Sequence, residues 1–241
     1  MNFSPFVYAR GRENVAITGT GTGTIDGNTA AGPWSGFDSR RGPDWDRLQQ
    51  MAVDGVPPAD REFGDGHYLK PNVVQLYDCR NVLISGVGIK NPAMWTIHPV
   101  LCTNVTVRDV TVYNRGAMVD GCDPEASKDV HITGCRFDTG DDGIAIKAGR
   151  DTDGRRVGVA SEDIVIDHCA FAGRWGAPTV GSEMSGGVRG VFFQDCTVKQ
   201  GTSYNRSTSS TSRRTSAGAA RSRTSTPAAS PRARSTARRS W

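Results

Sequence analysis

The sequence predicts an all-β protein, a parallel β-helix in which short strands stack coil upon coil. Three observations predict it. One strand-like segment recurs along the chain, no helical pattern long enough for a crossover separates its copies, and glycine is abundant, with 29 among 241 residues. A hydrophobic share of 37% is typical of a turn-rich β protein rather than of a helical one.

The recurring segment is a short alternating strand headed by Asn, Asp or Gly. Its copies occupy residues 14–19, 81–86, 104–109, 129–134, 163–168 and 190–195. From residue 81 onward, consecutive copies start about 23 to 34 residues apart, a period typical of solenoid repeats. A single coil cannot bury its own apolar face, so we expect the coils to be stabilised by stacking on one another.

Three cysteines, Cys135, Cys169 and Cys196, follow successive copies of the strand at the same place. In a stacked coil such small thiols recur inside the molecule, so we expect core packing rather than disulfides. The six cysteines of the chain leave the redox compartment open.

The repeat is interrupted between residues 28 and 70 by a polar segment that contains prolines and tryptophans. One short helix is expected within it, from Trp45 to Val53. An insertion on one face of a solenoid can shape a binding groove, but it can also be a tolerated surface loop. The sequence leaves both interpretations open.

The net charge of +4 is concentrated at one end of the chain. Residues 202–241 hold nine arginines and no acidic residue, which leaves the preceding part near −5. A nucleic-acid partner would rest on this segment alone, and we expect none. We also expect no membrane partner, because no run approaches the roughly 18 apolar residues of a membrane span. The first residues read as a strand rather than as a signal peptide.

We divide the chain into a β-helix domain at residues 1–200 and a Ser/Thr/Arg/Ala-rich tail at residues 201–241. The tail has no apolar periodicity to bury, so we expect it to be disordered. It is either a basic tail for nucleic acid or a cell surface, or the product of a lost reading frame that replaces the last coils. The abrupt change in mid-repeat favours the second, which predicts an incomplete, poorly soluble and weakly active chain.

Two acidic sites are the candidate functional residues. Asp120 stands alone, whereas Asp141 and Asp142 are adjacent and are flanked by Gly140 and Gly143. Carboxylates held close together raise each other's proton affinity, which suits general acid–base catalysis. A solvated Asp-Gly turn is the alternative, since both residue types are common in turns.

Several motifs in one order bear on this choice. They are Gly-Thr-Ile-Asp-Gly at 23–27, Trp-Thr-Ile-His-Pro at 95–99, Asp120-Gly121 with Asp123-Pro124, Gly140-Asp141-Asp142, Ile146-Lys147 and Gly181-Ser182-Glu183. Over residues 5–200 the chain resembles the polygalacturonases, family 28 of the glycoside hydrolases, and in particular their bacterial exo-acting members. The resemblance implies a right-handed single-stranded parallel β-helix of the pectin lyase-like type. It also implies hydrolysis, with inversion, of α-1,4-galacturonan or a related pectic chain of the cell wall.

By that resemblance Asp141 is the general acid, and Asp120 and Asp142 together orient and deprotonate the attacking water. Asp120 and the adjacent pair fall on neighbouring repeats, and stacked strands lie about 4.8 Å apart. One coil step combined with a sideways step fits the roughly 6.5–9.5 Å that separates the carboxylates of inverting enzymes.

Substrate binding is assigned to three further residues. Lys147 is expected to bind the substrate carboxylate, with a structural ion pair as its alternative. His98 belongs to the Trp-Thr-Ile-His-Pro motif, and Trp175 can stack on a sugar ring. The chain departs from the family pattern at Trp175, where a histidine is expected, and at Met118, where Asn is expected. The later Arg-Ile-Lys that grips the substrate carboxylate is missing.

Two other functions stay open. A degenerate carbohydrate-binding β-helix without activity would fit these departures. A polysaccharide lyase on the same kind of solenoid would need a basic residue, often with calcium, instead of three acids. We expect no cofactor and no metal: His67, His131 and His168 form no metal-like cluster, and Asp151 to Gly154 reads as a solvated turn rather than a calcium loop. We expect a monomer, and the family implies an extracellular or periplasmic location.

Overall fold

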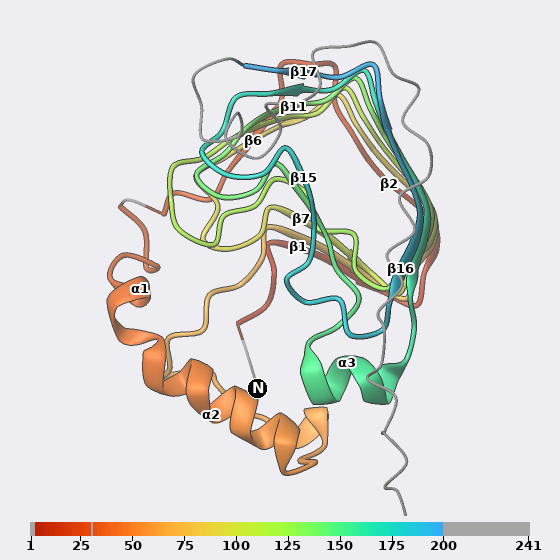
Figure 1. Ribbon diagram of the computed structural model, residues 1–241. Coiled ribbons are helices and arrows are strands. Elements are labelled where there is room, and N and C mark those ends of the chain that lie inside the picture. Colours follow the sequence, from red (N-terminus) through yellow and green to blue (C-terminus); the bar gives the residue numbers. More distant parts are fainter. Residues whose placement is uncertain (1–2, 30, 200–241) are drawn as a thin grey trace, which may run out of the picture.

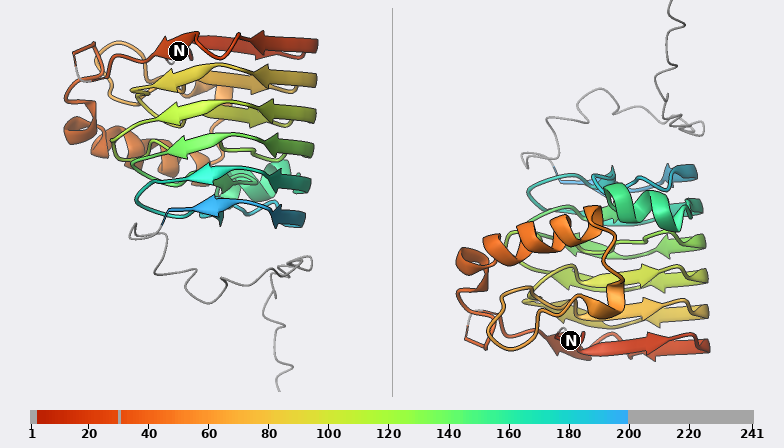
Figure 2. Two further views of the ribbon diagram at one scale, coloured as in Figure 1. Left: turned by 90° about the horizontal axis from the view of Figure 1, so that it is seen from above. Right: turned by 90° about the horizontal axis from the view of Figure 1, so that it is seen from below.

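The computed structural model describes residues 3–29 and 31–199, which form a parallel β-helix (Figure 1). Seen from the side, the coils stack along one axis, each placing its strands directly beneath those of the coil before it (Figure 2). Neighbouring strands in all the sheets are parallel and come from successive coils.

Three walls enclose the core. The first, here called the repeat sheet, consists of β2 (Glu13–Thr18), β5 (Arg80–Ser85), β8 (Thr103–Arg108), β10 (Lys128–Thr133), β13 (Ser161–Asp167) and β16 (Val188–Gln194). The second consists of β3 (Thr24–Asp26), β6 (Gly88–Lys90), β9 (Thr111–Tyr113), β11 (Arg136–Asp138), β14 (Ala170–Phe171) and β17 (Thr197–Val198). The third, here called the site sheet, consists of β1 (Val7–Arg10), β4 (Val74–Tyr77), β7 (Ile97–Val100), β12 (Ile144–Ile146) and β15 (Pro178–Val180). Between β7 and β12 the site sheet is reduced to isolated bridges through Cys122 and Glu125.

All six strands predicted from the repeat are present, and they form the repeat sheet in chain order. The residue that heads each copy has a left-handed backbone, with φ between 53° and 65° at Asn14, Asn81, Asn104, Asp129, Asp163 and Gly190. Asn, Asp and Gly are the residues that adopt this conformation most readily, which explains why they recur at that position. The Asn81 side chain donates to Asn14 at 3.0 Å, and Asn104 donates to Asn81 at 2.9 Å, so the heads also form a ladder.

The core is made of stacked rows of aliphatic side chains. In the repeat sheet, Val82, Val105 and Val130 occupy one register position and Ile84, Val107 and Ile132 the next, and all six are buried. Burying each such side chain stabilises the fold by about 1.5–3 kcal/mol before entropy is counted. Of the three cysteines predicted to pack in the core without disulfides, Cys135 and Cys169 are buried free thiols, whereas Cys196 is a free thiol that is only partly buried.

The segment that interrupts the repeat carries α1 (Phe37–Arg40), α2 (Gly42–Val53) and the short 3₁₀ turn η1 (Pro58–Asp60), all on the side of the site sheet (Figure 1). The helix predicted from Trp45 is confirmed and begins three residues earlier, with Pro43 in its first turn. Helix α2 runs across several coils and ends near α3 (Asp151–Val157) (Figure 2).

The expectation of a turn at Asp151 to Gly154 is wrong, because these residues form the first part of α3. The reason is a partner far away in the sequence. The Arg61 guanidinium donates to both carboxylate oxygens of Asp153, at 2.5 and 3.1 Å, and Arg156 also reaches Asp153. Arg61 thereby ties the interrupting segment to α3 in the described structure.

The predicted tail at residues 201–241 lies outside the described residues, and the division of the chain at residue 200 stays a prediction. None of the helices in the described part of the chain is long and apolar enough to cross a membrane.

Candidate active site

The three candidate aspartates lie on adjacent coils, as predicted. The backbone stacks in sequence here: the Gly121 N–H donates to the Asp142 carbonyl at 3.0 Å, and the Gly143 N–H donates to the Gly176 carbonyl at 2.8 Å. Asp120 therefore lies beside the Asp141–Asp142 pair at the point where the site sheet is interrupted. The predicted separation of their carboxylates stays a prediction.

Asp120 has the clearest electrostatic signature of the three. Burial raises the pKa of Asp120 to about 6, although a hydrogen bond with Asp123 and the Lys147 charge act in the opposite direction. The negative charges of Asp141 and Asp142 add to the rise, so the three carboxyl groups are close enough to interact. A carboxylate with this pKa is ionised at neutral pH yet is a much stronger base than an exposed aspartate.

The adjacent pair is held by backbone N–H groups. Asp141 accepts from the N–H of Met118 at 3.1 Å and from that of Asp142 at 3.0 Å. Asp142 accepts from the Gly176 N–H at 2.7 Å. Burial raises the pKa of Asp142, while that hydrogen bond and one with Thr179 limit the rise. A Cβ atom at Gly176 would lie 1.9 Å from the Thr179 hydroxyl and 2.9 Å from Asp142, so only glycine fits at this contact.

Lys147 is enclosed by the same carboxyl groups. Its ammonium lies 2.9 Å from Glu183, 3.6 Å from Asp120 and 3.7 Å from Asp123, and the side chain is 5% exposed. It also lies 4.4 Å from the centre of the Trp95 ring. Burial lowers the pKa of Lys147, but the surrounding carboxylates outweigh burial and raise it above its ordinary value. The geometry is that of the ion-pair alternative, and its role toward substrate stays a prediction.

Asp123 is a functional candidate that the sequence interpretation quoted without a role. The residue is 0% exposed, and complete burial together with the Asp120 charge raises its pKa well above the ordinary range. We interpret Asp123 as a neutral carboxylic acid that donates a hydrogen bond to Asp120. Its only signal in the sequence was its place three residues after Asp120.

His98 lies in the floor of the site, with both ring nitrogens engaged. Nδ1 faces the side-chain amides of Asn72 at 2.8 Å and Gln75 at 3.0 Å, and Nε2 lies 2.7 Å from Glu125. Because amide N–H₂ groups donate, this arrangement assigns Nδ1 as the acceptor and Nε2–H as the donor. The Trp95 ring packs edge-on against His98 at 5.0 Å, so His98 fixes an aromatic wall of the site.

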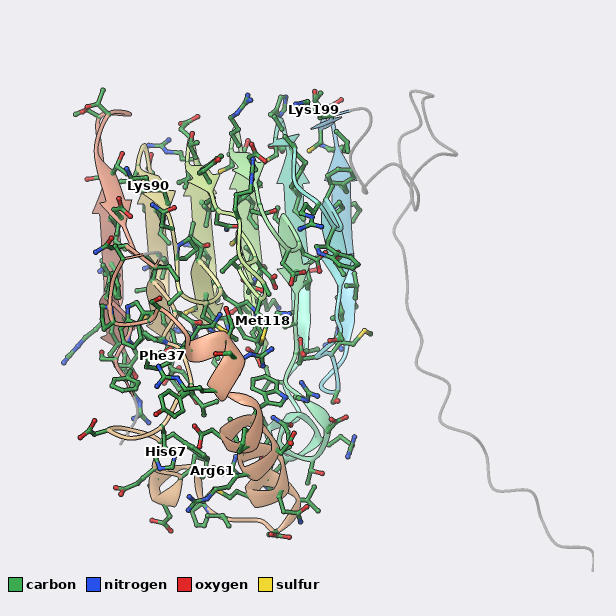
Figure 3. The ribbon with its side chains drawn as sticks, turned by 90° about the vertical axis from the view of Figure 1, so that its left-hand side faces the viewer. Phe37, Arg61, His67, Lys90, Met118 and Lys199 are labelled. Atoms are coloured by element: carbon green, nitrogen blue, oxygen red, sulfur yellow. The ribbon has the colours of Figure 1, made fainter. Side chains whose placement is uncertain are left out.

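The two residues that depart from the family pattern both lie at the candidate carboxylates. Trp175 is 60% exposed and directly precedes Gly176, the donor to Asp142. Met118 has φ 59°, a conformation that costs a methionine more than an asparagine. Figure 3 shows Met118 on the side of the solenoid that faces Phe37 of α1, whereas Lys90 and Lys199 lie toward the opposite side.

A cavity of about 580 Å³ adjoins these residues between α2 and the site sheet. The catalytic candidates Asp120, Asp141 and Asp142 do not line it; it meets them through Trp95, Met118 and Glu183. Its other polar or aromatic walls include Arg41, Trp45, Lys70, Asn72, Gln75, Glu125 and Arg150. The interrupting segment thus shapes a groove, which favours the first of its two interpretations.

Sequence reasoning missed the residues whose roles depend on stacking. Glu183 binds Lys147 across 36 residues, and Arg150 reaches Glu183 across 33. The motif at 181–183 was a usable signal for Glu183, but Arg150 and Gly176 had none. Among the described residues, no group of three His, Cys, Asp or Glu side chains is arranged to hold a metal ion.

Comparison with known proteins agrees with this geometry. Residues 58–218 match the profile of glycosyl hydrolases family 28. A probable polygalacturonase from Vitis vinifera is 27% identical over 196 residues, covering 80% of this chain and 35% of that protein. The structure of a hyperthermoactive exopolygalacturonase from Thermotoga maritima superposes with a TM-score of 0.76 at 44% identity, covering 81% of this chain and 46% of that one.

A polygalacturonase from Erwinia carotovora superposes with a TM-score of 0.60 at 24% identity, covering 81% of this chain and 46% of that chain. With the parallel pairing seen here, these neighbours confirm a right-handed parallel β-helix. The chain spans about a third of the length of the Vitis relative and about half of these two solved chains.

Proposed function

The chain belongs to family 28 of the glycosyl hydrolases, and from that premise we propose that it hydrolyses α-1,4-galacturonosidic linkages of pectic chains with inversion at the anomeric carbon. One observation carries the proposal. Three aspartates from adjacent coils meet beside a cavity, and the pKa values of Asp120 and Asp142 are raised by burial. Carboxyl groups tuned in this way are what acid–base hydrolysis of a glycoside requires.

We assign the three aspartates the roles that the resemblance to the family implies. Asp141 donates a proton to the glycosidic oxygen as the bond to the anomeric carbon breaks. Asp120 and Asp142 orient a water on the opposite face of the sugar and take its proton as the new C–O bond forms. Backbone donors from Met118 and Gly176 hold the pair in place, so little reorganisation accompanies the proton transfers.

Three neighbouring side chains support the aspartates, namely Lys147, Glu183 and Asp123. The buried ammonium of Lys147 lies within 3.7 Å of all three neighbouring carboxyl groups, and its charge offsets the cost of burying the carboxylates of Asp120 and Glu183. A protonated Asp123 steadies the Asp120 carboxylate through a hydrogen bond. Because Lys147 already pairs with Glu183 and Asp120, a substrate carboxylate has to share its ammonium group with them.

For substrate binding we propose Trp175 as an exposed stacking surface, with His98 acting through the aromatic wall at Trp95. The Thermotoga neighbour is an exopolygalacturonase, and α2 walls the cavity beside the aspartates here. We therefore propose attack from a chain end, which releases short products. We also propose a monomer outside the cytoplasm, working on pectic polysaccharide without a cofactor, a nucleic acid or a membrane.

The test is an assay of the purified chain on polygalacturonate with two detectors. Release of reducing ends without an ultraviolet-absorbing unsaturated product identifies a hydrolase, whereas an absorbing product identifies a lyase. Binding of oligogalacturonate without either product identifies a carbohydrate-binding protein and overturns the proposal. Nuclear magnetic resonance of the first product formed distinguishes inversion from retention.

A further inference from the structure

Helix α2 presents an aromatic ring to the cavity between two guanidinium groups. The Arg150 guanidinium lies 5.2 Å from the centre of the Trp45 ring, and that of Arg41 lies 5.7 Å from it. All three residues line the cavity. They come from different elements, since Arg41 precedes α2 and Arg150 lies between β12 and α3.

The two guanidinium groups have weak carboxylate contacts. Arg150 is 40% exposed and lies 3.4 Å from Glu183 and 3.5 Å from Asp151. Arg41 lies 3.5 Å from Asp38, and its Nε is buried without a hydrogen-bond partner among the described residues. Charge-assisted hydrogen bonds are normally about 2.7–2.9 Å long, so neither arginine makes a full bond to a protein carboxylate.

The other two cations of the cavity wall are fully engaged. Arg61 donates to both oxygens of Asp153 and to the Val56 carbonyl. The ammonium of Lys70 donates to Asp38 at 2.6 Å, and its side chain is 2% exposed. Arg61 and Lys70 therefore hold the fold together, whereas Arg41 and Arg150 keep donors that their protein contacts do not fully use.

A series of short contacts connects Arg150 with the candidate carboxylates. Arg150 lies 3.4 Å from one oxygen of Glu183, whose other oxygen lies 2.9 Å from Lys147, which in turn lies 3.6 Å from Asp120. Trp95 and Glu183 line the cavity on that side. The cavity beside Trp45 therefore adjoins the candidate carboxylates through Trp95 and Glu183.

We propose that Arg41, Trp45 and Arg150 form a binding subsite for a uronate residue of the substrate, next to the residues flanking the cleaved bond. The inference rests on the proposed function and adds where the anionic chain is held. The two guanidinium groups bind the uronate carboxylate, and the indole, over whose ring both lie, holds them in place. A neutral galactose or methyl-esterified unit has no carboxylate to bind, so the subsite selects acidic chains.

The test measures binding of trigalacturonate by isothermal titration calorimetry, in an Asp141→Asn background that prevents turnover. We expect Arg150→Gln to raise Kd about tenfold and Arg150→Gln with Arg41→Gln to raise it further, because charged hydrogen bonds are lost. The salt dependence of Kd should flatten in the double variant. Arg136→Gln, in β11 and outside the cavity lining, is the matched control and should leave Kd unchanged.

Unchanged Kd values in both variants, with trigalacturonate still bound, would overturn the subsite and leave the proposed function standing. Failure of the Asp141→Asn protein itself to bind trigalacturonate would overturn both. Circular dichroism checks folding, and if Arg41→Gln does not fold, Arg150→Gln alone decides. A merely structural arginine–indole contact would lower thermal stability without changing Kd or its salt dependence.

Discussion

The repeat sheet and the site sheet belong to the same coils, but they bury different kinds of side chain. The repeat sheet runs unbroken through six strands, with aliphatic rows facing inward. The site sheet is interrupted between β7 and β12, and at the interruption it buries Asp120, Asp123 and Lys147. An unbroken sheet fixes the register of every coil, so the other wall can hold charged groups that would otherwise cost stability.

The largest effect is expected at Asp141, the proposed general acid. Asp141→Asn keeps the size of the side chain and one of the two oxygens that accept from backbone N–H groups, so we expect a native circular dichroism spectrum. It removes the proton donor, so we expect hydrolysis to fall by about 10²–10⁴-fold, the usual contribution of such a group. Reducing-end release by the two proteins measures the effect, and unchanged turnover in a folded variant would refute the role of Asp141.

The second prediction compares the loss of the buried Lys147 charge at the site sheet with a loss of core packing in the repeat sheet. Lys147→Met removes the cation that pairs with the carboxylates of Asp120 and Glu183, and leaving a buried charge unpaired costs about 3–5 kcal/mol. Ile132→Val in the repeat sheet removes one buried methylene and should cost about 0.5–1.5 kcal/mol. Urea unfolding of both variants measures the difference. Equal losses would show that the ion cluster contributes no more than a methylene.

The two sheets should also differ in pH dependence, because their buried acids shift in opposite directions. Burial raises the pKa of Asp167 in the repeat sheet, but hydrogen bonds with Thr133, His168 and His131 outweigh burial and lower it to about 2, whereas the pKa of Asp120 is raised. The folded pKa of about 6 lies above the ordinary 3.8, so the folded chain keeps a proton that the unfolded chain has lost. The contribution of Asp120 to stability should therefore fall by roughly 3 kcal/mol as pH rises from 4 to 6 and then level off. Hydrolysis should rise over the same interval, because the base must be ionised.

Asp120→Asn is the control for the titration. The amide cannot ionise, so urea midpoints of this variant should decline less between pH 4 and 6 than those of the unmodified chain. A parallel decline in the two proteins would show that another group titrates in this range.

The repeat sheet was predictable from the sequence, whereas much of the site was not. Each strand head needs only a residue that tolerates a left-handed backbone, and Asn81 or Asp129 shows this locally. Asp120, Asp141 and Asp142 were found because motifs in order mark them. Arg61 pairs with Asp153 across 92 residues, and no local pattern announces that contact or the helix it stabilises.

The smallest expected effect concerns Met118. The left-handed positions that head the repeat strands are Asn, Asp or Gly, whereas this left-handed position is a methionine. Met118 has φ 59°, as the asparagine heads of the repeat do, but it lacks the short polar side chain that tolerates this conformation. Met118→Asn should stabilise the fold by up to about 1 kcal/mol, since a left-handed residue of ordinary type costs about 1–2 kcal/mol. The Met118 N–H that donates a hydrogen bond to Asp141 is a backbone group and remains in the variant, so hydrolysis should rise modestly or stay the same. Thermal unfolding measures the gain, and Met118→Ala is the control because alanine tolerates a positive φ no better than methionine. A variant less stable than the unmodified chain would show that side-chain packing at Met118, rather than backbone strain, decides the energy at this position.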